Sequence, residues 1–137
     1  APPAAQVMNE VADFVGDIPL MAHNAAFDQK FWDAELALVR RRRVQPFACS
    51  LLLSRRLLPQ APSHKLGNLN RWAQLPSTGR AHRALADAEM AANLTCYMST
   101  LLRERHGIND ISHELFCTLQ KIPAAQIGQV LEGLRQA

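Results

Sequence analysis

Apolar residues recur at helical spacing along most of the chain. Val7, Val11 and Phe14 predict a helix over 6–15, which Gly16 and Asp17 bring to an end. The same periodicity predicts further helices over 28–40, 51–58, 65–75 and 84–105, one around Phe116, and one that begins at Pro123. The long helix should stop at Gly107, because glycine readily adopts the left-handed conformation that ends helices.

Two short apolar runs, 18–22 and 47–50, predict buried strands. Two short strands make a poor sheet by themselves. We therefore expect an α-rich chain from which strands are missing, or which borrows strands from elsewhere.

An aspartate lies on the apolar face of the long predicted helix. Spacings of three and four place on one side of it the residues Asp87, Met90, Ala91, Leu94, Met98 and Leu101. An unpaired carboxylate on a core-facing surface is costly, and a bound divalent cation would remove that cost. The alternative is an aspartate in the first helical turn that only interacts with the helix dipole.

His82 precedes Asp87 by five residues, which on a continuous helix turns the two side chains about 140° apart. His82 therefore belongs to a loop before the helix if it is to act with Asp87, and Thr78 and Gly79 are suited to such a loop. A loop histidine can move in and out, as a general base requires. A plain exposed histidine is the alternative.

Asp28 follows the first apolar run and opens the second predicted helix. Such strand-to-helix junctions commonly hold active-site groups. The alternative is structural: Asn24 and Asp28 are good helix N-terminal residues, His23 can be a hydrogen-bonded structural histidine, and Phe27 can be a core residue.

The amino-acid composition limits the class of protein to which this chain can belong. A chain of 137 residues, 48% hydrophobic and 20% charged, suits one globular domain with one core. The net charge of +3 is only a weak indication of a polyanionic partner.

The cysteines and the apolar runs indicate a compartment. Cys49, Cys96 and Cys117 are odd in number and far apart, which argues against a zinc site or redox pair and favours the reducing cytoplasm. No apolar run approaches the roughly 18 residues of a membrane span, so no membrane partner is expected. The first residues lack a signal peptide and an initiator methionine, and we expect a chain cut from something longer.

Four consecutive arginines, Arg40 to Arg43, end the second predicted helix. Cations near a helix C-terminus interact favourably with its dipole, so a solvated cap explains them. The alternative is contact with a phosphate backbone, on a surface that Arg55, Arg56, Lys65 and Arg71 would extend.

Three motifs follow one another in a specific order: His23-Asn24-x-x-Phe27-Asp28, His64-Lys65-Leu66-Gly67 and His82-x-Ala84-x-x-Asp87-Ala88. Together they resemble the DEDDh 3′→5′ exonucleases, the family of the bacterial DNA polymerase III epsilon proofreading subunit. The resemblance covers roughly residues 1–105.

The resemblance implies an α/β, RNase H-like exonuclease fold. It implies that Asp28 and Asp87 bind Mg²⁺ or Mn²⁺ in a two-metal site and that His82 deprotonates the attacking water. It also implies substrate contacts, from Asn24, Phe27, His64 and Lys65. The product would be a nucleoside 5′-monophosphate released from a nucleic acid 3′ end, with DNA favoured over RNA.

The family's first motif, an Asp-x-Glu on an early strand, is absent. Asp33-Ala34-Glu35 has the right residues but lies inside a predicted helix, after the second motif, where residues two apart point to different sides. We therefore expect an exonuclease domain over 1–106, N-terminally truncated so that helices dominate and the metal site is incomplete. Residues 107–137 are expected to form a helical extension.

The leading hypothesis is a metal-dependent 3′→5′ exonuclease whose isolated chain is weakly active or inactive. The alternative is a non-catalytic module with a degenerate exonuclease fold that binds nucleic acid, a DNA polymerase or a second copy of itself. The absent first motif favours the module, whereas the retention of Asp28, His82 and Asp87 favours the enzyme. A purely structural helical domain would require all three motifs to arise by chance.

Overall fold

The computed structural model describes residues 3–76 and 84–136. The elements within them are α1 (Ala4–Val15), β1 (Leu20–Ala22), α2 (Ala25–Leu38), β2 (Phe47–Cys49), α3 (Ser50–Leu57), α4 (Leu66–Trp72), α5 (Ala84–His106), α6 (His113–Leu119), the short 3-10 helix η1 (Ala124–Gln126) and α7 (Ile127–Leu134). This order confirms the predicted succession of helices and strands. Gly107 ends α5 with a φ of 64°, as predicted. None of the described helices is both long and apolar enough to cross a membrane.

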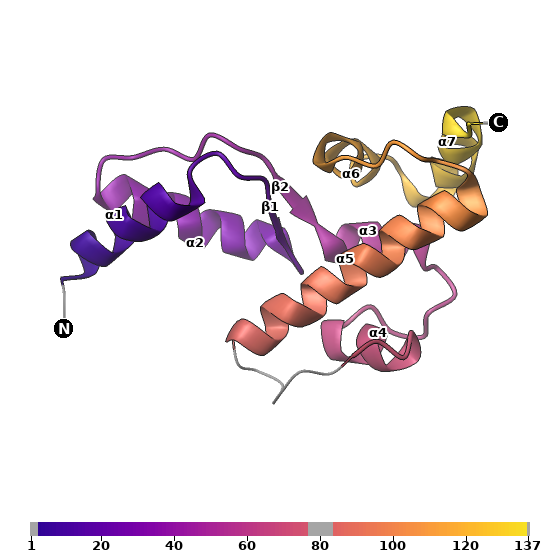
Figure 1. Ribbon diagram of the computed structural model, residues 1–137, viewed down its shortest axis with the longest axis horizontal. Coiled ribbons are helices and arrows are strands. Elements are labelled where there is room, and N and C mark those ends of the chain that lie inside the picture. The colour runs from indigo at the N-terminus through magenta and orange to yellow at the C-terminus, as the bar shows by residue number, and fades with distance from the viewer. Residues whose placement is uncertain (1–2, 77–83, 137) are drawn as a thin grey trace.

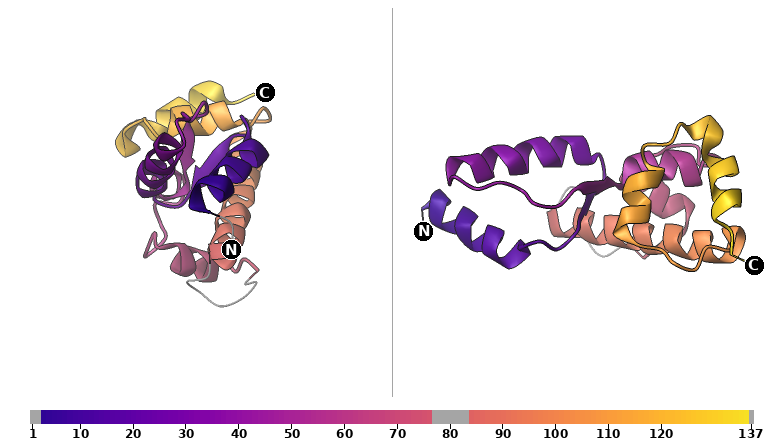
Figure 2. Two further views of the ribbon diagram at one scale, coloured as in Figure 1. Left: turned by 90° about the vertical axis from the view of Figure 1, so that its left-hand side faces the viewer. Right: turned by 90° about the horizontal axis from the view of Figure 1, so that it is seen from above.

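The elements form an arm and a helical body (Figure 1). Helices α1 and α2 lie together as the arm, and β1 and β2 lead from it into a body built from α3 to α7 (Figure 2). The long helix α5 runs through this body, with α4 on one side and the α6–α7 segment on the other. This arrangement places the strands at the junction of the two parts.

The core lies in the body. Its fully buried large apolar side chains are Leu53, Leu58, Leu69, Leu94, Met98, Leu102 and Leu119. The burial of Leu94, Met98 and Leu101 confirms the predicted apolar face of α5. The same cluster continues to Phe116 and Leu131, so one core spans α3 to α7. The division of the chain at residue 106 remains a prediction.

The two strands pair in parallel, with Leu20 opposite Phe47 and Ala22 opposite Cys49. The outer edge of β2 is covered by one side chain, that of Gln120 just after α6. Its Nε2 donates to the carbonyl of Phe47 at 3.1 Å, and its Oε1 accepts from the Cys49 N–H at 2.6 Å. A side-chain amide thus takes the place of a third strand at this edge.

The opposite edge of the sheet is the outer side of β1. Since Phe47 and Cys49 point their backbone groups at Gln120, Ala48 between them must face β1 and pair with Leu20 and Ala22. The N–H and C=O of Met21 therefore point away from β2. Within residues 3–76 and 84–136 no hydrogen bond to these two groups is found.

The arm leaves large apolar side chains in solvent. Phe14 is 84% exposed, Phe27 71% and Phe31 62%. The prediction of Phe27 as a core residue is therefore wrong, and Phe31 on the same helix is exposed as well. Helix α2 packs through Ala25 and Leu36 instead, and the described part of the chain leaves Phe27 and Phe31 largely uncovered. Apolar exposure of this extent usually marks a surface that another element or partner covers.

Gln120→Leu is expected to lower the free energy of unfolding by about 1–3 kcal/mol, because it leaves the Phe47 carbonyl and the Cys49 N–H without partners. Urea unfolding monitored by circular dichroism measures the change. Gln129→Leu, the same replacement at an exposed position of α7, is the control and should change stability little. Equal effects of the two substitutions would contradict the assigned role of Gln120.

Candidate functional site

A cleft of about 1190 Å³ opens where the sheet meets α5. Its walls come from the end of β1, the first turn of α2, helix α4, most of α5 and the start of α6. The cleft therefore draws on all three sequence motifs and on residues beyond them, such as His113 and Phe116.

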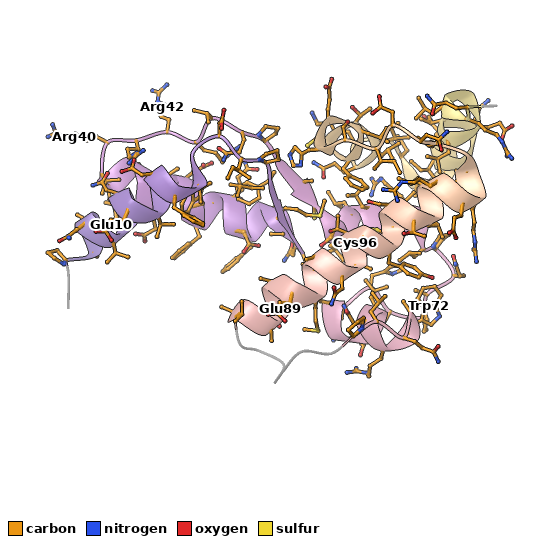
Figure 3. The ribbon with its side chains drawn as sticks, in the orientation of Figure 1. Glu10, Arg40, Arg42, Trp72, Glu89 and Cys96 are labelled. Atoms are coloured by element: carbon orange, nitrogen blue, oxygen red, sulfur yellow. The ribbon has the colours of Figure 1, made fainter. Side chains whose placement is uncertain are left out.

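The floor of the cleft is a row of small residues on α5. Spacings of three and four place side by side Ala84, Ala88, Ala91, Ala92, Thr95, Cys96 and Ser99. The Thr95 Oγ1 lies 2.7 Å from the Met21 Sδ, which ties this floor to β1. Cys96, labelled in Figure 3, is exposed on the same helix. Sequence reasoning missed this row, although the spacing of small residues beside the apolar face was the available signal.

The two predicted metal-binding aspartates line this one cleft. Asp28 is exposed in the first turn of α2, and Asp87 is half-buried in the first turn of α5. They come from the arm and the body respectively, and the cleft brings them to a common space. The third predicted reactive group, His82, lies outside the described residues.

His23 connects three separate segments of the chain. Its Nε2 lies 2.7 Å from the carbonyl oxygen of His64, and its Nδ1 lies 2.9 Å from the Ser50 Oγ. A carbonyl oxygen only accepts, so Nε2 carries a proton and donates it. In the neutral imidazole, Nδ1 has no proton and accepts from the Ser50 hydroxyl. These bonds favour the structural alternative for His23, although the residue also lines the cleft.

The pKa of His23 reflects this environment. Burial lowers the pKa below the ordinary value of 6.5, and the positive charge of Arg55 lowers it further, while the hydrogen bond to the His64 carbonyl opposes the shift. This direction favours the neutral ring, in which Nδ1 accepts from the Ser50 hydroxyl.

The turn between β1 and α2 has a particular geometry. Asn24 adopts the left-handed conformation with a φ of 70°, which asparagine tolerates better than most residues. Its side chain makes no capping hydrogen bond to α2. Instead the thiol sulfur of Cys49 accepts from the Ala25 N–H at 3.3 Å and from the Leu52 N–H at 3.5 Å, so it serves the first turns of two helices.

The predicted substrate-binding residues divide into two groups. Lys65 lines the cleft, whereas Asn24, Phe27 and His64 are not among its lining residues. The His64 Nε2 donates to the Leu58 carbonyl at 2.9 Å, which holds the loop before α4. Roles of all four in substrate binding remain predictions.

The donor set is small for a two-metal site. In the described part of the chain, no cluster of three or more His, Cys, Asp or Glu side chains is suitably placed to hold a metal ion. Asp33 and Glu35 lie within α2, as expected, and Asp33 forms a 2.8 Å ion pair with Arg43. Asp28 and Asp87 provide carboxylate oxygens of the hard type that Mg²⁺ and Mn²⁺ prefer, but these are only two carboxylates.

The four consecutive arginines also divide into two groups. Arg41 pairs with Asp13 at 2.8 Å and Arg43 with Asp33, so both hold the arm together. Arg40 and Arg42 extend from the outer edge of the arm into solvent (Figure 3). The segment follows the end of α2 at Leu38 and lies apart from the cleft.

Comparison with known families decides the membership of the chain. The family model RNase_T, described as "Exonuclease", matches residues 1–95. The chain belongs to this exonuclease family. The match includes Asp28, Asp87 and every predicted substrate-binding residue, and it ends within α5. The predicted membership is confirmed, and it suggests an RNase H-like fold, with which the mixture of helices and parallel strands is compatible.

Similar proteins carry the family domain within much longer chains. Relatives described as DNA polymerase III PolC-type, from Streptococcus mutans serotype c and from Streptococcus pyogenes serotype M18, are each 34% identical over 112 residues. The aligned part is 81% of this chain and 8% of each relative, so the chain spans a small part of these polymerases. No solved structure gives a significant match.

The pKa of His23 predicts a dependence of stability on pH. The unfolded chain protonates this residue near pH 6.5, whereas the folded chain resists protonation, so stability should fall as the pH drops below that value. His23→Gln removes this contribution, and its free energy of unfolding should vary less between neutral and mildly acidic pH. Urea unfolding at a series of pH values measures both slopes.

The control for this experiment is His106→Gln, at the end of α5, where no hydrogen bond to the ring is found within the described residues. This variant should keep the pH dependence of the unaltered chain. A His23→Gln variant with that same dependence would show that the buried ring does not contribute to it.

Proposed function

We propose that this chain provides part of the active site of a metal-dependent 3′→5′ exonuclease. The observation that carries the proposal is the convergence of Asp28 and Asp87 on one cleft in a chain of the exonuclease family. The reaction is hydrolysis of the terminal phosphodiester, which releases a nucleoside 5′-monophosphate. The likeness to DNA polymerase III supports a DNA 3′ end as substrate, and with it a cytoplasmic place of action.

Each residue has a proposed task. Asp28 and Asp87 would hold Mg²⁺ or Mn²⁺, and His82 would take the proton from the attacking water. The metal ions supply charge stabilisation for the attacking and leaving oxygens when bound. Asp28 is solvent-exposed and Asp87 half-buried, so both carboxylates can reach the cleft without the cost of a fully buried charge.

We propose that the site needs further carboxylates, carried on a strand. The open edge of β1 supports this, since Met21 and Ala22 border the cleft and the backbone groups of Met21 point outward. A strand added at this edge would pair with β1 and project alternate side chains into the cleft. Two aspartates without such a strand are too few ligands for tight binding of two ions.

The second candidate is a non-catalytic module that binds nucleic acid or a DNA polymerase. The small set of metal ligands supports it, because binding of a nucleic acid strand does not require a complete metal site. The similarity to DNA polymerase III is equally compatible with this role. Retention of both aspartates at the cleft supports the enzyme instead.

The pure chain is expected to bind Mn²⁺ weakly and to digest an oligonucleotide labelled at its 3′ end slowly or not at all. The reason is that only two of the required carboxylates are present. Titration of Mn²⁺ followed by electron paramagnetic resonance measures binding, and denaturing gels measure digestion. Asp28→Asn and Asp87→Asn should each reduce the remaining Mn²⁺ binding.

Asp17→Asn is the matched control, since Asp17 is exposed after α1 and is not among the cleft residues. Robust Mg²⁺-dependent digestion by the pure chain would contradict the proposed incompleteness. Mn²⁺ binding that none of the cleft variants changes would contradict the ligand assignment.

In an active form of the protein, His82→Ala is expected to reduce the rate of hydrolysis by about 10²–10⁴, the usual contribution of a general base. Single-turnover digestion at saturating Mg²⁺ measures this rate separately from binding. His106→Ala, at the far end of α5, removes a histidine elsewhere and should leave the rate unchanged. Digestion by His82→Ala at the unaltered rate would exclude the general-base role.

A further inference from the structure

The charges of this chain are unevenly distributed along the sequence. Ten of the fifteen Lys and Arg residues, and none of the twelve Asp and Glu residues, lie between positions 36 and 86. A solvated surface normally mixes both signs, so a block of one sign indicates an anionic partner. The overall charge of +3 conceals this block.

Only part of the block faces the cleft. Arg41 and Arg43 are neutralised by carboxylates in the arm. Lys65 and Arg71, by contrast, are exposed side chains that line the cleft. Within residues 3–76 and 84–136 no carboxylate lies within ion-pair distance of either one. These two cations form, with Asn68 between them, what we call the α4 lip.

Arg71 is held in place on this lip. Its Nη2 donates to the Oδ1 of Asn68, whose Nδ2 in turn donates to the Ser63 Oγ at 3.0 Å. The guanidinium is thus oriented without a charged partner, and its remaining N–H groups can donate to an anion.

The lip has the chemistry of a phosphate contact. Lys65 directly precedes α4, and Arg71 lies in its last turn. Both line the same cleft as Asp28 and Asp87, which are its acidic residues. One region of the cleft thus suits cations and another suits the anionic backbone of a nucleic acid chain.

We infer that the α4 lip binds the backbone phosphates of a single nucleic acid strand, at the nucleotides that precede the scissile bond. Lys65 and Arg71 each contact a phosphate, and Asn68 positions Arg71. This inference rests on the proposed function for the location of the 3′ end at Asp28 and Asp87. Phosphate binding by the lip itself does not depend on hydrolysis.

The test is binding of a fluorescein-labelled single-stranded oligonucleotide by the 137-residue chain in EDTA, measured by fluorescence anisotropy over a series of salt concentrations. Each phosphate contact to a single strand contributes about 0.7 to the slope of log Kobs against log salt. Lys65→Gln and Arg71→Gln should each reduce the slope by about 0.7, and the double variant by about 1.4. Circular dichroism verifies that the variants fold.

The matched control is the double variant Arg103→Gln/Arg105→Gln, which removes the same charge from exposed positions in the last turn of α5. Its slope should equal that of the unaltered chain. Equal losses in the two double variants would overturn the inference, because net charge alone would then explain binding. An unchanged slope in Lys65→Gln/Arg71→Gln, or no measurable binding at low salt, would also overturn it.

Asn68→Ala tests the positioning of Arg71. It removes no charge, so the slope should persist while affinity falls about fivefold, the equivalent of one ordinary net hydrogen bond. An unchanged affinity would overturn the role of Asn68. Because EDTA prevents hydrolysis, a chain without exonuclease activity would still give these slopes, so the two proposals fail independently.

Discussion

The neutral imidazole of His23 is the constraint on which the geometry of the cleft depends. It bonds Ser50 at the start of α3 and His64 directly before Lys65, while Asp28 follows five residues later along the chain. One half-buried ring therefore fixes the segment that bears Asp28 relative to the segment that bears Lys65. Protonation would give both ring nitrogens a hydrogen, so the Ser50 hydroxyl would have to turn and accept from Nδ1.

The other side of the cleft depends on the core. Helix α5 is anchored by Leu94, Met98 and Leu102, which are fully buried, and its small residues allow a close approach to the strand edge. Asp87 is thus placed by packing, whereas Asp28 is placed by polar contacts at a turn. This difference suits a site that must fix a carboxylate at one wall while the other remains accessible to solvent.

Helical periodicity predicted the helices, with end signals such as Gly107, and short apolar runs predicted both strands. It failed for Phe27, since an apolar pattern does not show whether anything covers the apolar face. The role of Gln120 at the edge of β2 could not be predicted from the sequence, because a contact across more than seventy residues leaves no local signal. The aspartates could be predicted because their motifs resemble a family; the α4 lip required the contacts of Asn68.

Three features of the described residues call for the same kind of element. The edge of β1 presents backbone groups of Met21 without hydrogen bonds, α1 and α2 expose Phe14, Phe27 and Phe31, and the cleft is lined by two carboxylates. A helix packed on the arm would cover the aromatic side chains but could not pair with the strand edge. A strand could pair with β1, carry apolar residues on one face and place carboxylates on the other, because its side chains alternate. We therefore propose that an added strand, rather than a helix, would pair with the edge of β1 and bring further carboxylates to the cleft.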